Sequence, residues 1–229
     1  GSCIGAEFDL GRLALVSELP AHECLSLLWN ILPAGVIQPA AGSGILMQRY
    51  LQTGEEIPAA DQEAIRFAFL HDRVQQAAYD QIQPADRSRV HLAIGQHLLR
   101  SLSREERSDR LIEIVTHLNQ GEALLDDRRE RLRLAKLNDD AADRAQNNAA
   151  FDAALRFVRA GRRCLPSDAW EKEYDLTYAM AIRQAECEYV LTHFDEADRS
   201  LKDVLQNART NLDRGRVYEI RVVKYGIQN

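Results

Sequence analysis

The stretch IRFAFLHDRVQQAAYDQI, residues 65–82, decides the fold because the period of its apolar residues changes inside it. Over residues 65–69 apolar side chains alternate between two directions, which is the pattern of a half-buried strand. From Asp72 onward the apolar residues follow the helical period, so we expect a helix to begin there. Asp72 occupies the position of a helix N-cap, and its carboxylate suits the positive end of the helix dipole.

His71 therefore lies at a predicted corner between a strand and a helix. The backbone N–H groups at a helix start favour an anion such as a phosphate. Arg73, two residues further on, adds a cation that assists such a contact or pairs with an acidic surface group. In the structural alternative, Asp72 caps the helix and His71 hydrogen-bonds a nearby carbonyl. The sequence leaves both interpretations of this corner open.

The residues before this corner predict two short helices followed by a strand, a loop and a second strand, which is the order of a winged-helix-like unit. Asp9 is expected to cap the first helix and Pro20 to open the second. Gly35 ends that second helix. Within residues 39–62, the stretch ILMQRYLQ fits either a strand or a helical turn. The apolar positions of the second helix keep helical spacing: Cys24, Leu27, Leu28, Ile31 and Leu32.

Beyond Pro84 the chain is predicted to be helical to its end. The string FDAALR at Phe151 returns as FDEADR at Phe194, 43 residues later. This echo predicts two helical hairpins in series, each longer than the 34-residue tetratricopeptide unit, with Phe151 and Phe194 buried at equivalent positions. The expected helices of this half are residues 127–146, 150–164, 169–191, 194–208 and 210–225.

Composition excludes several classes of protein. With 229 residues, 45% hydrophobic and 28% charged, the chain has a normal globular balance. Its net charge of −6 disfavours binding to nucleic acid. No apolar run approaches the length of a membrane span and no signal peptide is visible, so we expect a cytoplasmic protein without membrane contact. The cysteines show no C-x-x-C pair and are expected to be reduced and buried: Cys3, Cys24, Cys164 and Cys187.

Catalytic and metal-binding patterns are absent from the sequence. It has no Walker A loop, no G-x-S-x-G elbow and no kinase signature, so we expect no enzymatic activity and no cofactor of its own. His91 and His97 are six residues apart on one predicted helix and do not share a face, and no histidine has a partner at metal-ligand spacing. The acidic cluster Asp139-Asp140 and Asp143 is expected to be a solvated surface, opposed by the arginines within residues 128–133.

The string FLHDRVQQAAY, residues 69–79, resembles the segment that follows the nucleotide-binding domain in large bacterial signalling proteins. Those proteins join a serine/threonine-kinase-like domain, a STAND-type (signal-transduction ATPase) module, and often GAF and sensor histidine kinase domains. The ATPase core and both kinase domains lie outside this sequence. Further stretches resemble the same proteins, so that the resemblance spans nearly the whole chain: CIGAEFDL from Cys3, VHLAIGQHLL from Val90, THLNQG from Thr116, LAKLNDDAADRA from Leu134 and WEKEYDLTYAMA from Trp170.

The resemblance implies a role for the corner. Leu70-His71-Asp72 resembles the Met-His-Asp motif of STAND proteins of the plant-resistance and apoptosis type, with leucine in place of methionine. In those proteins the histidine contacts the phosphate of bound ADP. The resemblance thus implies that His71 and Asp72, assisted by Arg73, sense the ADP or ATP held by an upstream NTPase domain.

We therefore expect a mostly α protein in two parts, cut from a longer chain, with Gly1-Ser2 as a cloning scar. Residues 3–102 are predicted to form a winged-helix-like regulatory unit with a small β element. Residues 103–229 are predicted to form antiparallel tetratricopeptide-like helical hairpins. The expected function is non-catalytic: the chain couples the nucleotide state of the upstream domain to downstream signalling domains, and its repeats bind a protein partner.

The alternative is a winged-helix DNA-binding transcriptional regulator. That function requires a basic recognition helix, and the helix from Asp72 offers only Arg73 in its first turn.

Overall fold

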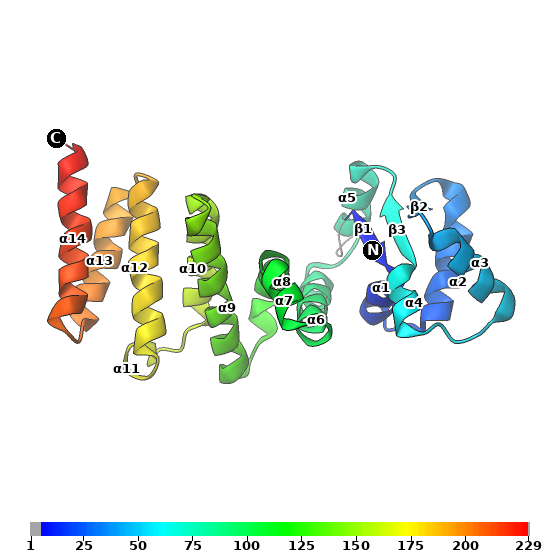
Figure 1. The fold of residues 1–229 in the computed structure, drawn as a ribbon, viewed down its shortest axis with the longest axis horizontal. Coiled ribbons are helices and arrows are strands. Elements are labelled where there is room, and N and C mark those ends of the chain that lie inside the picture. The colour runs from blue at the N-terminus through cyan, green and yellow to red at the C-terminus, as the bar shows by residue number, and fades with distance from the viewer. Residues whose placement is uncertain (1–5, 229) are drawn as a thin grey trace. The chain divides into compact units, whose positions relative to one another are not determined.

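The computed structural model describes residues 6–228, and most of them are helical (Figure 1). Gly1-Ser2 and Cys3 lie outside the described residues. The contacts divide the chain into two units. The first takes in the residues up to Ser108 together with Thr116–Leu124, and the second takes in Asp109–Val115 and the residues from Leu125 on. A mostly α fold with a small antiparallel sheet and helical hairpins is confirmed, whereas the boundary between residues 102 and 103 stays a prediction.

The sheet of the first unit has three antiparallel strands in the order β1-β3-β2. They are β1 (Glu7–Asp9), β2 (Ile37–Pro39) and β3 (Arg66–Phe69). The predicted alternation along β3 is confirmed, because Ile65 and Phe67 are buried and Arg66 is exposed. Phe67 lies opposite Phe8, and their rings are 5.7 Å apart. The strand β1 was not predicted, since three residues are too few to show a period of two.

Helices surround this sheet in the first unit. They are α1 (Leu10–Ser17), α2 (Ala21–Ile31), α3 (Ser43–Thr53), α4 (Ala59–Ala64), α5 (Asp72–Asp80) and α6 (Pro84–Ser101), with 3₁₀ turns η1 (Leu32–Ala34) and η2 (Glu122–Leu124). Asp9 caps α1 as predicted, accepting a hydrogen bond from the backbone N–H of Arg12 at 2.7 Å. The ambiguous ILMQRYLQ is helical and forms most of α3, between Gly42 and Gly54 at positive φ. Two helices thus separate β2 from β3, where a loop was expected.

The buried face of α2 differs from the prediction. Cys24 and Leu28 are buried as expected, but the third buried residue is Leu25. Leu27 and Ile31, expected in the core, are exposed. Apolar residues occupy both sides of this helix. Their spacing alone does not show which side packs against the rest of the first unit.

The second unit consists of helices packed in antiparallel pairs (Figure 1). They are α9 (Arg128–Asn147), α10 (Phe151–Cys164), α11 (Ala169–Lys172), α12 (Tyr174–Val190), α13 (Phe194–Asn207) and α14 (Asn211–Gln228). Two more helices, α7 (Arg104–Asp109) and α8 (Leu111–Gln120), each contain one of the points where the two units divide, and the third follows Leu124. The helix expected over residues 169–191 is broken at Glu173, whose φ of −126° and ψ of 44° are not helical.

The 43-residue echo corresponds to a repeated turn. Ala149, between α9 and α10, and Thr192, between α12 and α13, both have left-handed backbone, with φ of 56° and 62°. The next residues, Ala150 and His193, also match, with φ of −88° and −83° and the same ψ of 62°. Each turn is closed by a backbone hydrogen bond to a residue five positions earlier, at 2.9 and 2.8 Å. The two hairpins therefore turn in the same way.

The helices that follow these turns are packed similarly. Ala154 and Ala197 are fully buried at the matching positions of α10 and α13. Phe151 and Phe194 are only half-buried, so the expectation that both would be buried is wrong. Each phenylalanine is the first residue of its helix, where the helix end leaves part of the ring in contact with solvent.

Gly161 marks the closest approach inside the second unit. A Cβ placed there would clash with the side chain of Met180 on α12 and lie 2.8 Å from the Cβ of Asn138 on α9. Replacing Gly161 by alanine should therefore lower the free energy of unfolding by about 1–3 kcal/mol, measured by urea denaturation. This loss should outweigh the roughly 1 kcal/mol by which alanine favours a helix over glycine.

Gly215 is the matched control, since it is also inside a helix. A Cβ at Gly215 would meet no atom of the described residues within 4 Å. Its replacement by alanine should raise the free energy of unfolding by about 0.5–1 kcal/mol. A gain in stability from both substitutions would mean that α10 does not approach its neighbours as closely as the structure shows.

Three of the four cysteines are described, and all three are buried and outside any disulfide: Cys24, Cys164 and Cys187. Burial raises the pKa of the Cys187 thiol to about 11, so this group stays protonated and unreactive. None of the helices among residues 6–228 is both long and apolar enough to cross a membrane.

Candidate functional site

The corner between β3 and α5 holds all three residues that the sequence singled out. His71 is the residue before the helix, with an extended backbone, and Asp72 is the first helical residue. The predicted cap at Asp72 is therefore wrong by one position. Aspartate is favoured both at the N-cap and in the first turn, so residue type alone does not separate the two positions.

The backbone holds this corner firmly. The carbonyl of His71 accepts hydrogen bonds from the N–H groups of Val74 and Gln75, at 2.9 and 3.2 Å. On the strand side, the N–H of Leu70 donates to the carbonyl of Val36 at 3.2 Å. The direction of the chain through His71 is thus fixed by the sheet and by the first turn of α5.

The side chains of the corner face outward. His71, Asp72 and Arg73 are all exposed. The side chain of His71, at the N-cap position, makes no capping hydrogen bond to α5. The first N–H groups of the helix are thus available to an anion, with one imidazole and one guanidinium beside them. The corner has the features of a phosphate contact, and its role as an ADP sensor stays a prediction.

A second cluster, which the sequence did not predict, joins α6 to α8. The Nδ1 atoms of His91 and His117 are 2.8 Å apart, and both side chains are buried. The hydroxyl of Tyr79 on α5 lies 3.3 Å from Nε2 of His91 and donates to Gln120 at 3.4 Å. At 2.8 Å one ring nitrogen donates and the other accepts, so the two Nδ1 atoms are not both protonated in this arrangement.

The sequence held a signal for this pair. His91 shares a helical stripe with Ile94, Gly95 and Leu98, all of them buried on α6. A histidine in a buried stripe needs a hydrogen-bond partner. The prediction that His91 and His97 do not share a face says nothing about a partner on another helix. Within the part of the chain that the structure describes, no group of three or more His, Cys, Asp or Glu side chains is arranged to hold a metal ion.

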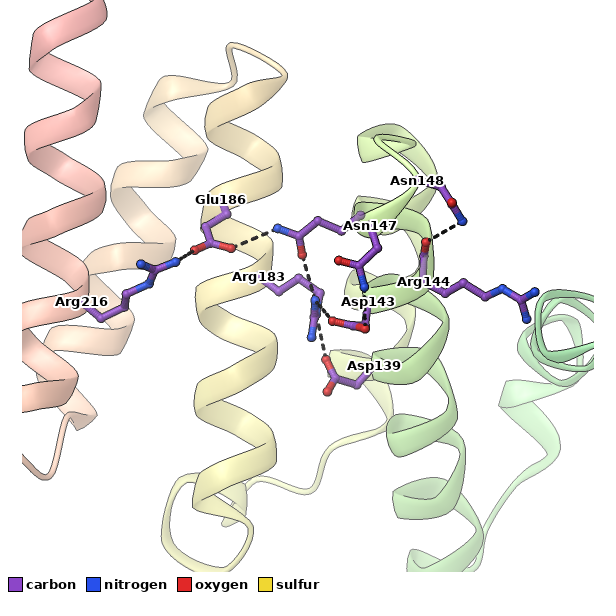
Figure 2. Close-up of polar contacts among 9 residues, drawn as sticks. Asp139, Asp143, Arg144, Asn147, Asn148, Arg183, Glu186 and Arg216 are labelled. Atoms are coloured by element: carbon purple, nitrogen blue, oxygen red, sulfur yellow. Dashed lines mark hydrogen bonds and ion pairs between the residues drawn. The ribbon is translucent and has the colours of Figure 1, made fainter. Parts of the chain in front are cut away.

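A third cluster lies on the face of the second unit formed by α9, α12 and α14. Figure 2 shows Arg183 of α12 reaching toward Asp139 and Asp143 of α9, at 3.1 and 2.9 Å. Burial opposes the charge of Arg183, but these two carboxylates outweigh it, so its pKa is raised. Glu186, one turn further along α12, accepts a hydrogen bond from Arg216 of α14 at 2.6 Å (Figure 2).

Asp140 and Asp143 are exposed, as expected for the acidic cluster, but Asp139 and the partner of the cluster differ from the expectation. Asp139 is mostly buried, and its partner is Arg183, 44 residues away, instead of an arginine of residues 128–133. Arg128 makes two hydrogen bonds to Asp168, at 2.8 and 3.1 Å. Arg131 donates to the backbone carbonyl of Arg163 at 2.6 Å. Arg128 and Arg131 at the start of α9 thus bind the loop after α10 and the last turn of α10.

Comparison with known proteins shows a similarity to a signalling protein. No protein-family model matches the chain, and no solved structure matches it significantly. The chain is similar to the hybrid signal transduction histidine kinase G of Dictyostelium discoideum, with 26% identity over 266 residues. The match covers 99% of this chain and 8% of that kinase. The resemblance to signal-transduction kinases is thus supported in its general form, and the STAND, winged-helix and tetratricopeptide assignments stay predictions.

Proposed function

We propose that this chain is a non-catalytic regulatory segment of a signal-transduction ATPase. It couples the nucleotide state of an NTPase domain encoded upstream to signalling domains that follow. The similarity to a hybrid histidine kinase supports a place in a signalling protein. The observation that carries the proposal is the corner itself, where exposed His71 lies at the start of α5 and its side chain makes no capping hydrogen bond.

The chemistry of the corner suits a diphosphate. His71 donates to a phosphate oxygen, the first N–H groups of α5 face the same anion, and Arg73 adds a positive charge. ADP held in this way stabilises the state in which the corner covers the nucleotide site. A ligand shifts such an equilibrium by its difference in affinity for the two states, so weakening this contact favours the signalling state.

The DNA-binding alternative receives no support from α5. Its one arginine, Arg73, is accompanied by Asp72 and Asp80, and a helix that reads DNA needs an excess of cations.

The test uses the longer protein that contains the NTPase domain. His71→Ala should speed the release of a fluorescent ADP analogue by about 10- to 100-fold, because a charge-assisted hydrogen bond to phosphate is worth about 1.5–3 kcal/mol. The residues described here carry no phosphate-binding loop of their own, so this chain alone should not bind ADP tightly.

His22→Ala is the matched control, since His22 is also exposed and lies in the first turn of another helix, α2. It should leave ADP release unchanged. Asp72→Ala should cost only about 0.3–1 kcal/mol of stability through the helix dipole, because Asp72 is not the cap. Equal release rates for wild type, His71→Ala and His22→Ala would overturn the proposed role of His71.

A further inference from the structure

The second unit has a cavity where α9, α12 and α14 meet. Its volume is about 270 Å³. Tyr189, Val190 and Ile220 form its apolar part, and Glu186, Arg216 and Glu219 belong to its polar lining. Val190 is 49% exposed, so an aliphatic side chain is open to a partner. Sites for drug-sized molecules begin near 300 Å³, so this cavity suits one or two side chains better than a nucleotide.

The charges on this face are unbalanced. Both arginines already pair with carboxylates of the face (Figure 2). Acidic groups outnumber basic ones on this face even when Lys136, one turn before Asp140 on α9, is counted. Arg144 is not counted, because its side chain points away from α12 (Figure 2). Five carboxylates accompany two guanidinium groups: Asp139, Asp140, Asp143, Glu186 and Glu219 against Arg183 and Arg216.

The surplus of negative charge has a local effect at Asp140. Partial burial raises the pKa of its carboxyl group, and the neighbouring Asp139 and Asp143 also raise it. Asp140, Asp143 and Glu219 are exposed, the last two at 54% and 62%, against 18% for Asp139, and Asp143 and Glu219 lie on or one turn from the cavity lining. A cation approaching the cavity would therefore meet Asp143 and Glu219.

We propose that this face of α9, α12 and α14 binds a basic segment of a partner protein, one that places an aliphatic side chain beside lysine or arginine. The aliphatic group packs against Val190 and Ile220, and the cation pairs with Glu219 or Asp143. This proposal names the class of protein partner and rests on the proposed function. In that function the helical array passes the nucleotide state to another protein.

The test measures binding of short fluorescein-labelled peptides to the chain of 229 residues by fluorescence anisotropy. The first peptide alternates leucine and lysine, the second replaces each leucine by serine, and the third replaces each lysine by glutamate. The first should bind at least about tenfold more tightly than either of the others at physiological ionic strength, where long-range attraction is screened. Equal binding of the leucine–lysine and serine–lysine peptides would show attraction by charge alone and overturn the proposal.

Two variants with the same added charge locate the site. Val190→Asp places a carboxylate in the cavity and should weaken binding of the leucine–lysine peptide by about tenfold. Leu212→Asp adds the same charge on α14 at a side chain that is 84% exposed and does not line the cavity, so affinity should be unchanged or slightly higher. Equal affinities for both variants would place binding elsewhere and overturn the proposal.

This assay contains no nucleotide and no NTPase domain. If the peptides do not bind, the ADP-release result for His71 is therefore unaffected. If His71→Ala does not change ADP release, the peptide-binding result is likewise unaffected.

Discussion

Replacing Glu188 by alanine should lower the free energy of unfolding of the helical array by about 3 kcal/mol. The Glu188 side chain is 1% exposed and joins three helices. It accepts hydrogen bonds from Arg159 of α10 at 2.9 Å, from Gln184 of its own helix at 2.8 Å and from Ser200 of α13 at 2.7 Å. The substitution leaves a cavity and a buried serine hydroxyl without its acceptor, and both are costly.

The expected loss is at the low end for a broken buried ion pair. Arg159 is 44% exposed, so its guanidinium can bind water when the carboxylate is removed. Urea denaturation at pH 7 measures the effect. Glu188→Gln keeps the shape but not the charge and should lose less stability than the alanine variant.

Glu196→Ala on α13 is the control. Glu196 is half-exposed and pairs with Arg199, one turn further along its helix. Such surface pairs contribute less than about 1 kcal/mol. If the Glu188 and Glu196 variants lose equal stability, Glu188 does not join the helices in the way that its contacts indicate.

The second large effect concerns pH and the pair His91–His117. Burial, together with the neighbouring His117, lowers the pKa of His91 to about 4. In the unfolded chain a histidine titrates near pH 6.5, so between these values the folded protein binds fewer protons. The stability contributed by neutral His91 is therefore complete above about pH 6.5 and is lost as the pH falls toward 4.

Protonation of His91 in the unfolded chain should therefore lower the free energy of unfolding by about 2 kcal/mol at pH 5 relative to pH 7. The groups facing His91 that titrate or carry charge are His117 on α8 and Tyr79 on α5, with Arg87 of α6 over the Tyr79 ring at 4.4 Å. An NMR titration should show a His91 ring that is neutral down to pH 5. Urea denaturation at several pH values measures the loss of stability.

His91→Gln removes the titrating group, so its free energy of unfolding should depend less steeply on pH than that of the wild type, whatever its value at pH 7. His97→Gln, on the same helix and only half-buried, should keep the wild-type dependence. A wild type and a His91→Gln variant with the same pH dependence would show that His91 does not carry this effect.

The sequence by itself determined the features that depend on neighbours in the chain. The alternation at residues 65–69 gave β3, the helical period after Asp72 gave α5, and the echo at Phe151 and Phe194 gave two hairpins with one kind of turn. Each is a local signal, because a strand shows its period over two residues and a helix over about four. The position of His71 at a corner between a strand and a helix follows from the first two.

Only the tertiary structure decided which of several equivalent neighbours a side chain meets. Arg183 pairs with Asp139 across two helices, although arginines stand much nearer along the chain. His91 finds His117, 26 residues away, and α2 buries Leu25 instead of Leu27. These choices depend on how helices pack against one another, and the packing follows from side chains far apart in the sequence, which no local period records.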